Sequence, residues 1–238
     1  MIAKHIKKLD SYVPGEQPSS TKVIKLNTNE NPYPPSPSCA EALKTFASEK
    51  LRLYPDPDCH TLRRAIAKVC KTTESRVFVG NGSDEILALA ARAFVEDNER
   101  IGSLDPSYSL YKTIAAIRNV PWLGVSSLDE AESLVAKKNA PSLFLLTNPN
   151  APTGEWREMA TIANFAKKFP GVVLIDEAYA DFSRGNCMAL ATAEKNRNTI
   201  VMRTFSKSYS LAGLRVGYCV GPESLISALY KIKDSYNV

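Results

Sequence analysis

A lysine in a serine-rich segment is the first residue of this sequence that could do covalent chemistry. Lys207 lies between Ser206 and Ser208, shortly after the apolar run 199–202. A lysine at the end of a buried strand loses part of its hydration, and a desolvated amine is a better nucleophile. The alternative is a solvated lysine in a surface turn, the ordinary place for this residue type. The segment therefore predicts a reactive amine at a strand end.

A possible anion-binding group follows in the same segment. Arg215 lies eight residues after Lys207, close enough to return to the same pocket. There its guanidinium could clamp an anionic group together with the hydroxyls of Thr204 and Ser206. A reactive amine beside hydroxyls and an arginine indicates a phosphorylated aldehyde as the ligand.

Composition places the chain among globular proteins. Its 238 residues are 44% hydrophobic, enough to bury a substantial core in one large domain. No stretch approaches the roughly 18 apolar residues of a membrane span, and the N-terminus lacks the apolar core of a signal peptide. We therefore expect a cytoplasmic protein that does not enter a membrane.

Charge and cysteine content argue against a nucleic-acid-binding, disulfide-rich or zinc-binding protein. The net charge is +5, and the basic residues are scattered among acids instead of clustering with aromatics, so we expect no nucleic-acid partner. The five cysteines are odd in number and show no CxxC spacing, which argues against a disulfide framework and against a zinc site. We expect free thiols, no metal and a small anionic ligand.

From residue 77 onward, short apolar runs alternate with helical patterns. This alternation predicts an α/β fold, in which a mostly parallel sheet is covered by helices on both faces. The proline-rich residues 1–60 predict an N-terminal arm that includes a first helix. Ligands of such sheets bind beyond the carboxyl ends of the strands, where the candidate motifs lie. The expected strands are 77–79, 100–103, 143–146, 172–175, 200–202 and 216–220, and the expected helices are 83–95, 107–117, 129–138, 157–168 and 223–235.

The turn Gly80–Asp84 joins the first expected strand to a helix. Gly82 permits close approach of a ligand, and Ser83 and Asp84 open the helix, whose free backbone N–H groups point at an anion. A plain capped helix start is an equal alternative. A dinucleotide site fits less well, because Glu85 stands where the third glycine of GxGxxG belongs.

Four further side chains follow other apolar runs. Tyr108 could stack on a planar ligand or pack in the core. Asn148 lies in a proline-fixed polar loop, which could aim its amide or form only a long turn. Asp176 ends the most hydrophobic run, so its carboxylate must be paired or neutral; a metal or a helix cap is the alternative role. Tyr179, three residues later, could donate a hydrogen bond to the same ligand.

These motifs resemble those of the fold type I aminotransferases, which use pyridoxal phosphate. The resemblance lies in Ser-Lys-x-Tyr-x-Leu-Ala-Gly-Leu-Arg-x-Gly at 206–217, Asn-Pro-x-x-Pro-Thr-Gly at 148–154 and Pro-x-Tyr-Ser-x-Tyr at 106–111. Within these motifs, Ala151 departs from the asparagine common in that family, and Ser210 replaces a common glycine.

The resemblance implies a role for each candidate residue. Lys207 would carry the cofactor covalently, and Tyr108 would stack on its ring. Asn148 and Tyr179 would bond the phenolic oxygen. Asp176 would pair with the protonated ring nitrogen, which makes the cofactor an electron sink. The residues expected around the cofactor phosphate are Gly82, Ser83, Asp84, Thr204, Ser206 and Arg215.

The arm resembles that of one branch of this family, the histidinol-phosphate aminotransferases. There the residue matching Asn29 lies near the substrate, and the one matching Tyr12 approaches the substrate phosphate. The tyrosine matching Tyr54 reaches the cofactor phosphate of the partner subunit, which implies a homodimer. The segments that carry this resemblance are 12–18, 25–33 and 54–58.

The implied reaction is transamination of L-histidinol phosphate with 2-oxoglutarate, a step of histidine biosynthesis. A threonine-phosphate decarboxylase, which shares these motifs, and a non-catalytic cofactor-binding fragment are the alternatives. We expect an arm with a first helix at 1–60 and a cofactor-binding large domain at 61–238. A C-terminal small domain, which in this family carries the arginine for the substrate carboxylate, is expected to be absent, so this chain could be inactive.

Overall fold

The computed structural model describes residues 1–9, 15–16, 19, 22–137 and 139–237. Within them the chain forms a seven-stranded sheet in the order β1-β7-β6-β5-β4-β2-β3. Strand β7 runs antiparallel to both of its neighbours, and the other pairs are parallel. The strands are β1 (Val77–Gly80), β2 (Ile101–Leu104), β3 (Trp122–Val125), β4 (Leu143–Thr147), β5 (Val172–Asp176), β6 (Thr199–Thr204) and β7 (Gly217–Val220).

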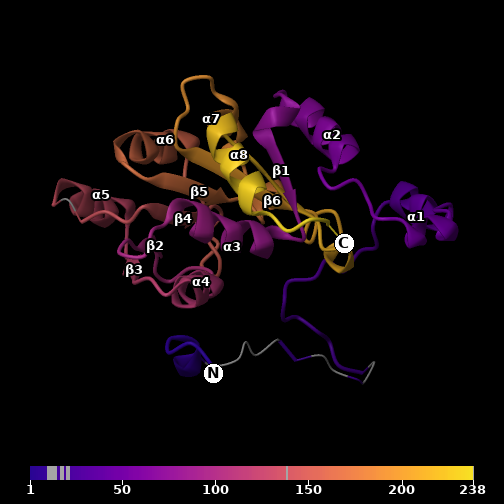
Figure 1. The fold of residues 1–238 in the computed structure, drawn as a ribbon, viewed down its shortest axis with the longest axis horizontal. Helices are drawn as coiled ribbons and strands as arrows, with labels where there is room; N and C mark the ends of the chain where they lie inside the picture. Colours follow the sequence, from indigo (N-terminus) through magenta and orange to yellow (C-terminus); the bar gives the residue numbers. More distant parts are fainter. Residues whose placement is uncertain (10–14, 17–18, 20–21, 138, 238) are drawn as a thin grey trace.

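Helices cover both faces of this sheet (Figure 1). Helices α3, α4 and α8 contribute to the core on one face, and α2, α5, α6 and α7 contribute to the core on the other. The predicted α/β fold class is therefore confirmed. The helices are α1 (Pro37–Lys44), α2 (His60–Cys70), α3 (Ser83–Phe94), α4 (Leu110–Arg118), α5 (Leu128–Ala136), α6 (Met159–Lys168), α7 (Met188–Thr192) and α8 (Glu223–Ile232), and the 3₁₀ turns are η1 (Ile6–Lys8), η2 (Ser48–Arg52), η3 (Glu74–Arg76), η4 (Ala180–Phe182) and η5 (Ala212–Leu214).

Alternation along the central strands explains why both faces need a cover. In β4, Phe144 and Leu146 belong to one core cluster, whereas Leu143 and Leu145 belong to the other. Successive side chains of a strand point to opposite faces, so a strand that is apolar throughout must be buried on both sides. The run 143–146 therefore requires helices above and below it.

The sequence analysis missed two elements. Strand β3 lies at the edge of the sheet, and three of its four residues are only half-buried. An edge strand needs no continuous apolar run, and Gly124 interrupts this one further. Helix α7 has five residues, too few to show a helical period.

The arm lies largely outside the domain core. Figure 1 shows the N-terminal segment below the domain and α1 beside it, and α1 has no buried residue. Several apolar side chains of the arm are exposed, among them Ile24 at 84% and Leu26 at 83%. The proposed boundary between residues 60 and 61 falls at the start of α2, which packs on the sheet through Ile66 and Ala67. That division stays a prediction.

We expect truncation of a central strand residue to destabilise the domain strongly. Leu145 is fully buried, so Leu145→Ala should lower the free energy of unfolding by about 2–5 kcal/mol. The control Ile117→Ala, which truncates an exposed side chain of α4, should change it by less than about 0.5 kcal/mol. Urea unfolding followed by circular dichroism measures both variants. Equal effects would contradict the assignment of the core.

Candidate active site

Strand register brings the glycine turn next to the lysine segment. Gly217 of β7 pairs with Gly80 on one side and with Thr204 on the other. A Cβ atom at Gly217 would lie 2.5 Å from the backbone nitrogen of Ser83. A side chain at this position would therefore collide with the turn, and glycine is required so that the two segments can touch.

The residues around this contact form an anion cradle. Gly82 has φ +84°, and a Cβ there would lie 2.7 Å from Nη2 of Arg215. The guanidinium is half-exposed and lies 3.6 Å from Asp84 at the first turn of α3. Thr204 and Ser206 are buried, and their hydroxyl oxygens lie 2.9 Å apart. An arginine, hydroxyls and a helix N-terminus are the donors that bind phosphate groups.

Asp176 is a buried carboxylate at the end of β5. It is 4% exposed, and it accepts hydrogen bonds from the Tyr111 hydroxyl at 2.9 Å and the Ala178 amide at 3.0 Å. Among the described residues, no cationic side chain forms a salt bridge with it. Burial raises the pKa of Asp176 to about 6, and the charges of Asp84 and Glu177 add to the increase. Within the described part of the chain, the Asp176 carboxylate therefore has hydrogen-bond donors but no ion-pair partner.

Tyr111 is a site residue that the sequence analysis did not identify. It is 1% exposed, and its hydroxyl lies 2.6 Å from that of Thr147. An ionised carboxylate only accepts hydrogen bonds, so the Tyr111 proton goes to Asp176 and the Thr147 proton goes to Tyr111. The spacing of Tyr111 from Tyr108, one helical turn, was the available signal, but it does not reveal the carboxylate that Tyr111 contacts.

Tyr108 contacts Tyr111 and keeps part of its ring accessible. Its ring meets that of Tyr111 edge to face, with centroids 5.6 Å apart and planes at 83°. It remains 38% exposed. The partly exposed ring of Tyr108 can stack on a planar ligand.

The structure brings Lys207, Tyr179 and Asn29 together, although Asn29 belongs to the arm. The Lys207 ammonium donates to the carbonyl oxygen of Thr28 at 2.7 Å and lies 5.8 Å from the centre of the Tyr179 ring. Asn29 donates a hydrogen bond of 2.8 Å to the Tyr179 hydroxyl. The arm thus crosses the candidate site directly beside the lysine.

Other predicted residues lie elsewhere or are committed to different contacts. The Asn148 side chain accepts from the Arg157 amide at 2.8 Å and donates to the Arg157 carbonyl at 3.0 Å, so it fastens the loop that follows β4. Tyr54 is 82% exposed and stacks on Tyr236 with centroids 4.5 Å apart, and Tyr12 lies outside the described residues. The cofactor and substrate roles expected for these three residues stay predictions.

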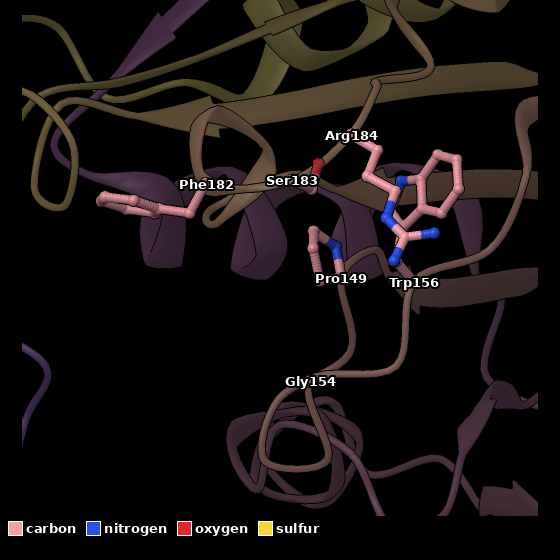
Figure 2. Close-up of a pocket in the computed structure, with 6 residues that line it drawn as sticks. All are labelled: Pro149, Gly154, Trp156, Phe182, Ser183 and Arg184. Carbon is pink, nitrogen blue, oxygen red and sulfur yellow. The ribbon is translucent and has the colours of Figure 1, made fainter.

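A separate cavity of about 570 Å³ opens beside the loop that follows β4 (Figure 2). Figure 2 shows Phe182 pointing away from the other lining residues. None of the predicted site residues lines this cavity, so it is peripheral to the arrangement above. Its lining residues are Pro149, Gly154, Trp156, Phe182, Ser183 and Arg184.

Two further kinds of feature are not found among the described residues. No group of three or more His, Cys, Asp or Glu side chains in these residues could hold a metal ion. No helix formed by them has the length and apolar character needed to cross a membrane.

Comparison with known proteins places this arrangement in a family. The sequence profile described as "Aminotransferase class I and II" matches residues 21–238. The chain belongs to the class I and II aminotransferase family. The resemblance of the sequence motifs to the aminotransferase family is thereby confirmed.

Curated members of the aminotransferase family share close sequence similarity with the chain. Histidinol-phosphate aminotransferases from Marinomonas sp. and Acetobacter pasteurianus are 45% and 44% identical over 98% of this chain. The chain spans 66% and 65% of those two proteins, which is about two thirds of their length.

Solved aminotransferase structures share the fold. The histidinol-phosphate aminotransferase of Sinorhizobium meliloti, in complex with pyridoxal-5'-phosphate, matches with a TM-score of 0.81 and 28% identity, over 87% of this chain and 59% of that one. The aspartate aminotransferase of Thermotoga maritima matches with a TM-score of 0.73 and 25% identity, over 88% and 61%.

Because Asp176 is buried, the free energy of unfolding of the ligand-free chain should depend on pH. Its folded pKa of about 6 lies above the ordinary value, so its contribution to stability is present below pH ~4 and is lost as the pH rises through 6. Asp176→Asn removes this loss. The free energy of unfolding of the variant, relative to that of the unmodified chain, should therefore rise by about 2 kcal/mol between pH 4 and pH 8.

Urea unfolding across this pH range measures the difference. The control is Asp129→Asn, which changes an exposed aspartate in the first turn of α5. Its stability relative to the unmodified chain should show no such gain. A pH-independent difference for Asp176→Asn would contradict the cost assigned to the buried carboxylate.

Proposed function

We propose that this chain is the cofactor-binding part of a pyridoxal-phosphate-dependent aminotransferase that acts on L-histidinol phosphate. The observation that carries the proposal is the buried Asp176, which has no cationic partner among the described residues and lies with Tyr108 and Tyr111 at the ends of the strands. A protonated pyridine ring supplies the missing charge. The cofactor-bound Sinorhizobium relative supports the same assignment.

The donor set fits pyridoxal phosphate. The anion cradle suits its phosphate, Tyr108 suits the face of its ring, and Asp176 suits its ring nitrogen. Lys207 supplies the amine for its aldehyde, and the Tyr179 hydroxyl is a donor for its phenolic oxygen. When bound, the cofactor provides an electron sink that makes the Cα–H bond of an amino substrate acidic. The residues of the cradle are Gly82, Ser83, Asp84, Thr204, Ser206 and Arg215.

The chain's own groups then have separate tasks. Asp176 keeps the site negatively charged opposite the ring nitrogen, and Tyr111 holds that carboxylate in place. The Lys207 amine acts as the general base that moves the proton at the substrate Cα. Its hydrogen bond to Thr28 and the bond from Asn29 to Tyr179 hold the arm over the site.

The substrate assignment rests on the relatives. Their names support L-histidinol phosphate as amino donor, and we propose 2-oxoglutarate as acceptor, in histidine biosynthesis in the cytoplasm. A threonine-phosphate decarboxylase from Porphyromonas gingivalis has a TM-score of 0.72 but 22% identity, so that likeness concerns the fold alone. The decarboxylase and a non-catalytic cofactor-binding domain are the alternative outcomes of the tests below.

We further propose a homodimer in which the arm packs against the partner. The exposed apolar side chains of the arm, the lack of buried residues in α1 and the exposed ring of Tyr54 support this assembly. In the proposed dimer, Tyr54 contacts the partner's cofactor site, and Tyr12 and Asn29 contact the substrate. The arm at 1–60 and the large domain at 61–238 are the proposed units.

A product assay of the full gene product tests the substrate. With histidinol phosphate and 2-oxoglutarate we expect glutamate, and with phosphothreonine we expect no release of carbon dioxide. Decarboxylation of phosphothreonine without glutamate formation would favour the decarboxylase. Absence of both products, together with cofactor binding, would favour a non-catalytic domain.

The role of Lys207 is tested on this chain alone. After incubation with pyridoxal phosphate and reduction with borohydride, the adduct should map to Lys207. Lys207→Ala should abolish it while weak non-covalent binding through the anion cradle remains. The control Lys167→Ala, on the exposed face of α6, should form the adduct normally. Peptide mapping that finds the adduct on another lysine in the unmodified chain would refute the assignment.

A further inference from the structure

A buried ion pair links the segment of Asp176 to the segment of Lys207. The side chain of Glu177 is fully buried, and that of Arg203 is 17% exposed. One carboxylate oxygen of Glu177 accepts a hydrogen bond of 2.9 Å from Nε of Arg203 and lies 2.9 Å from Nη2 of the same guanidinium. The other accepts from the backbone N–H of Cys187. These contacts hold the segment that follows β5 against β6.

A second contact joins the same two segments on the other side of the lysine. Asp181 accepts a hydrogen bond of 2.5 Å from the Ser208 hydroxyl. Its other oxygen lies 3.7 Å from Nη1 of Arg203. The two acids, Glu177 and Asp181, therefore lie on either side of Tyr179 in the sequence. Their partners, Arg203 and Ser208, lie on either side of Lys207.

We propose that Glu177, Arg203, Asp181 and Ser208 form a clamp that positions the Lys207 amine against Tyr179 and Asp176. The clamp residues are positioning residues, because they act through Lys207 and Tyr179. This inference rests on the proposed function of Lys207 as the amine that holds the cofactor. It adds a device that fixes the separation between the reactive amine and the groups that receive the ring.

The geometry favours positioning over a contribution to stability. A buried ion pair gives up the hydration of both charges, so its replacement by neutral groups is often harmless to stability, whereas removal of one partner strands a buried charge. Two nitrogens of the Arg203 guanidinium nevertheless contact one Glu177 oxygen, the other oxygen accepts from the Cys187 N–H, and the pair lies four residues from Lys207 and two from Tyr179. Charge-assisted contacts on both carboxylate oxygens fix the orientation of the Glu177 side chain as well as its distance from Arg203.

The test compares single and paired substitutions. Glu177→Gln and Arg203→Met each remove one charge, and the double variant removes both while Gln keeps an acceptor for the Cys187 amide. We expect the single variants to unfold at lower urea and the double variant to recover toward the unmodified chain. The matched control replaces the surface pair Glu132–Lys168, 2.7 Å apart between α5 and α6, by Gln and Met.

The deciding readout is the rate at which the covalent adduct forms at Lys207, followed by absorption and by borohydride trapping. The stable double variant should form it about tenfold to a hundredfold more slowly, as expected for a misplaced reactive group. The control pair should leave the rate unchanged. An unchanged rate in the stable double variant would overturn the proposal.

A second variant covers the case in which the double variant does not fold. Ser208→Ala removes the hydroxyl that Asp181 accepts from and strands no buried cation. It should also slow adduct formation, and a rate equal to that of the unmodified chain would overturn the proposal.

Failure of the clamp and failure of the proposed function give different results. If the unmodified chain forms no adduct at Lys207, the proposed function fails, and hydrogen exchange then decides the clamp. Loss of the pair should speed exchange of the backbone amides of 203–208 in the double variant relative to the control pair. Unchanged exchange in that segment would refute the clamp independently of the cofactor.

Discussion

The burial of the Asp176 carboxylate is the constraint on which the rest of the site depends. Strand β5 is apolar up to this residue and buried on both faces, so the carboxylate ends in a place that water does not reach. Tyr111 and the Ala178 amide satisfy part of its hydrogen-bonding capacity, but they supply no positive charge. A carboxylate buried in this way stays ionised at low cost only when a cation pairs with it, and the proposed cation is a protonated ring nitrogen.

The other groups are placed by strand ends that the sheet holds in register. Gly80, Gly217 and Thr204 lie in one row across three strands, and this row joins the phosphate-type cradle to the lysine segment. The second row, Thr147 and Asp176, supports the carboxylate from β4. Because these positions are set by backbone pairing, the separation between cradle and carboxylate is fixed before a ligand enters.

Much of the fold could be predicted from the sequence, because apolar strands and amphipathic helices report their own burial. The approximate positions of Lys207, Asp176 and the glycine turn follow from the same patterns, since each comes directly after a strand. The contacts of Asp176 with Tyr111 and of Glu177 with Arg203 could not be predicted, because they join residues 65 and 26 positions apart through tertiary packing. Edge strand β3 was missed because half-buried residues carry little hydrophobic signal.

The most direct test of the central claim is the protonation state of the bound cofactor. Pyridoxal phosphate labelled with ¹⁵N in the ring can be added to the chain, and its nitrogen chemical shift recorded from pH 6 to pH 9. If Asp176 pairs with the ring nitrogen, this nitrogen should stay protonated from pH 6 to pH 9. In the Asp176→Asn variant the ring nitrogen should lose its proton within that range. A bound ring that is unprotonated at neutral pH in the unmodified chain would contradict the account.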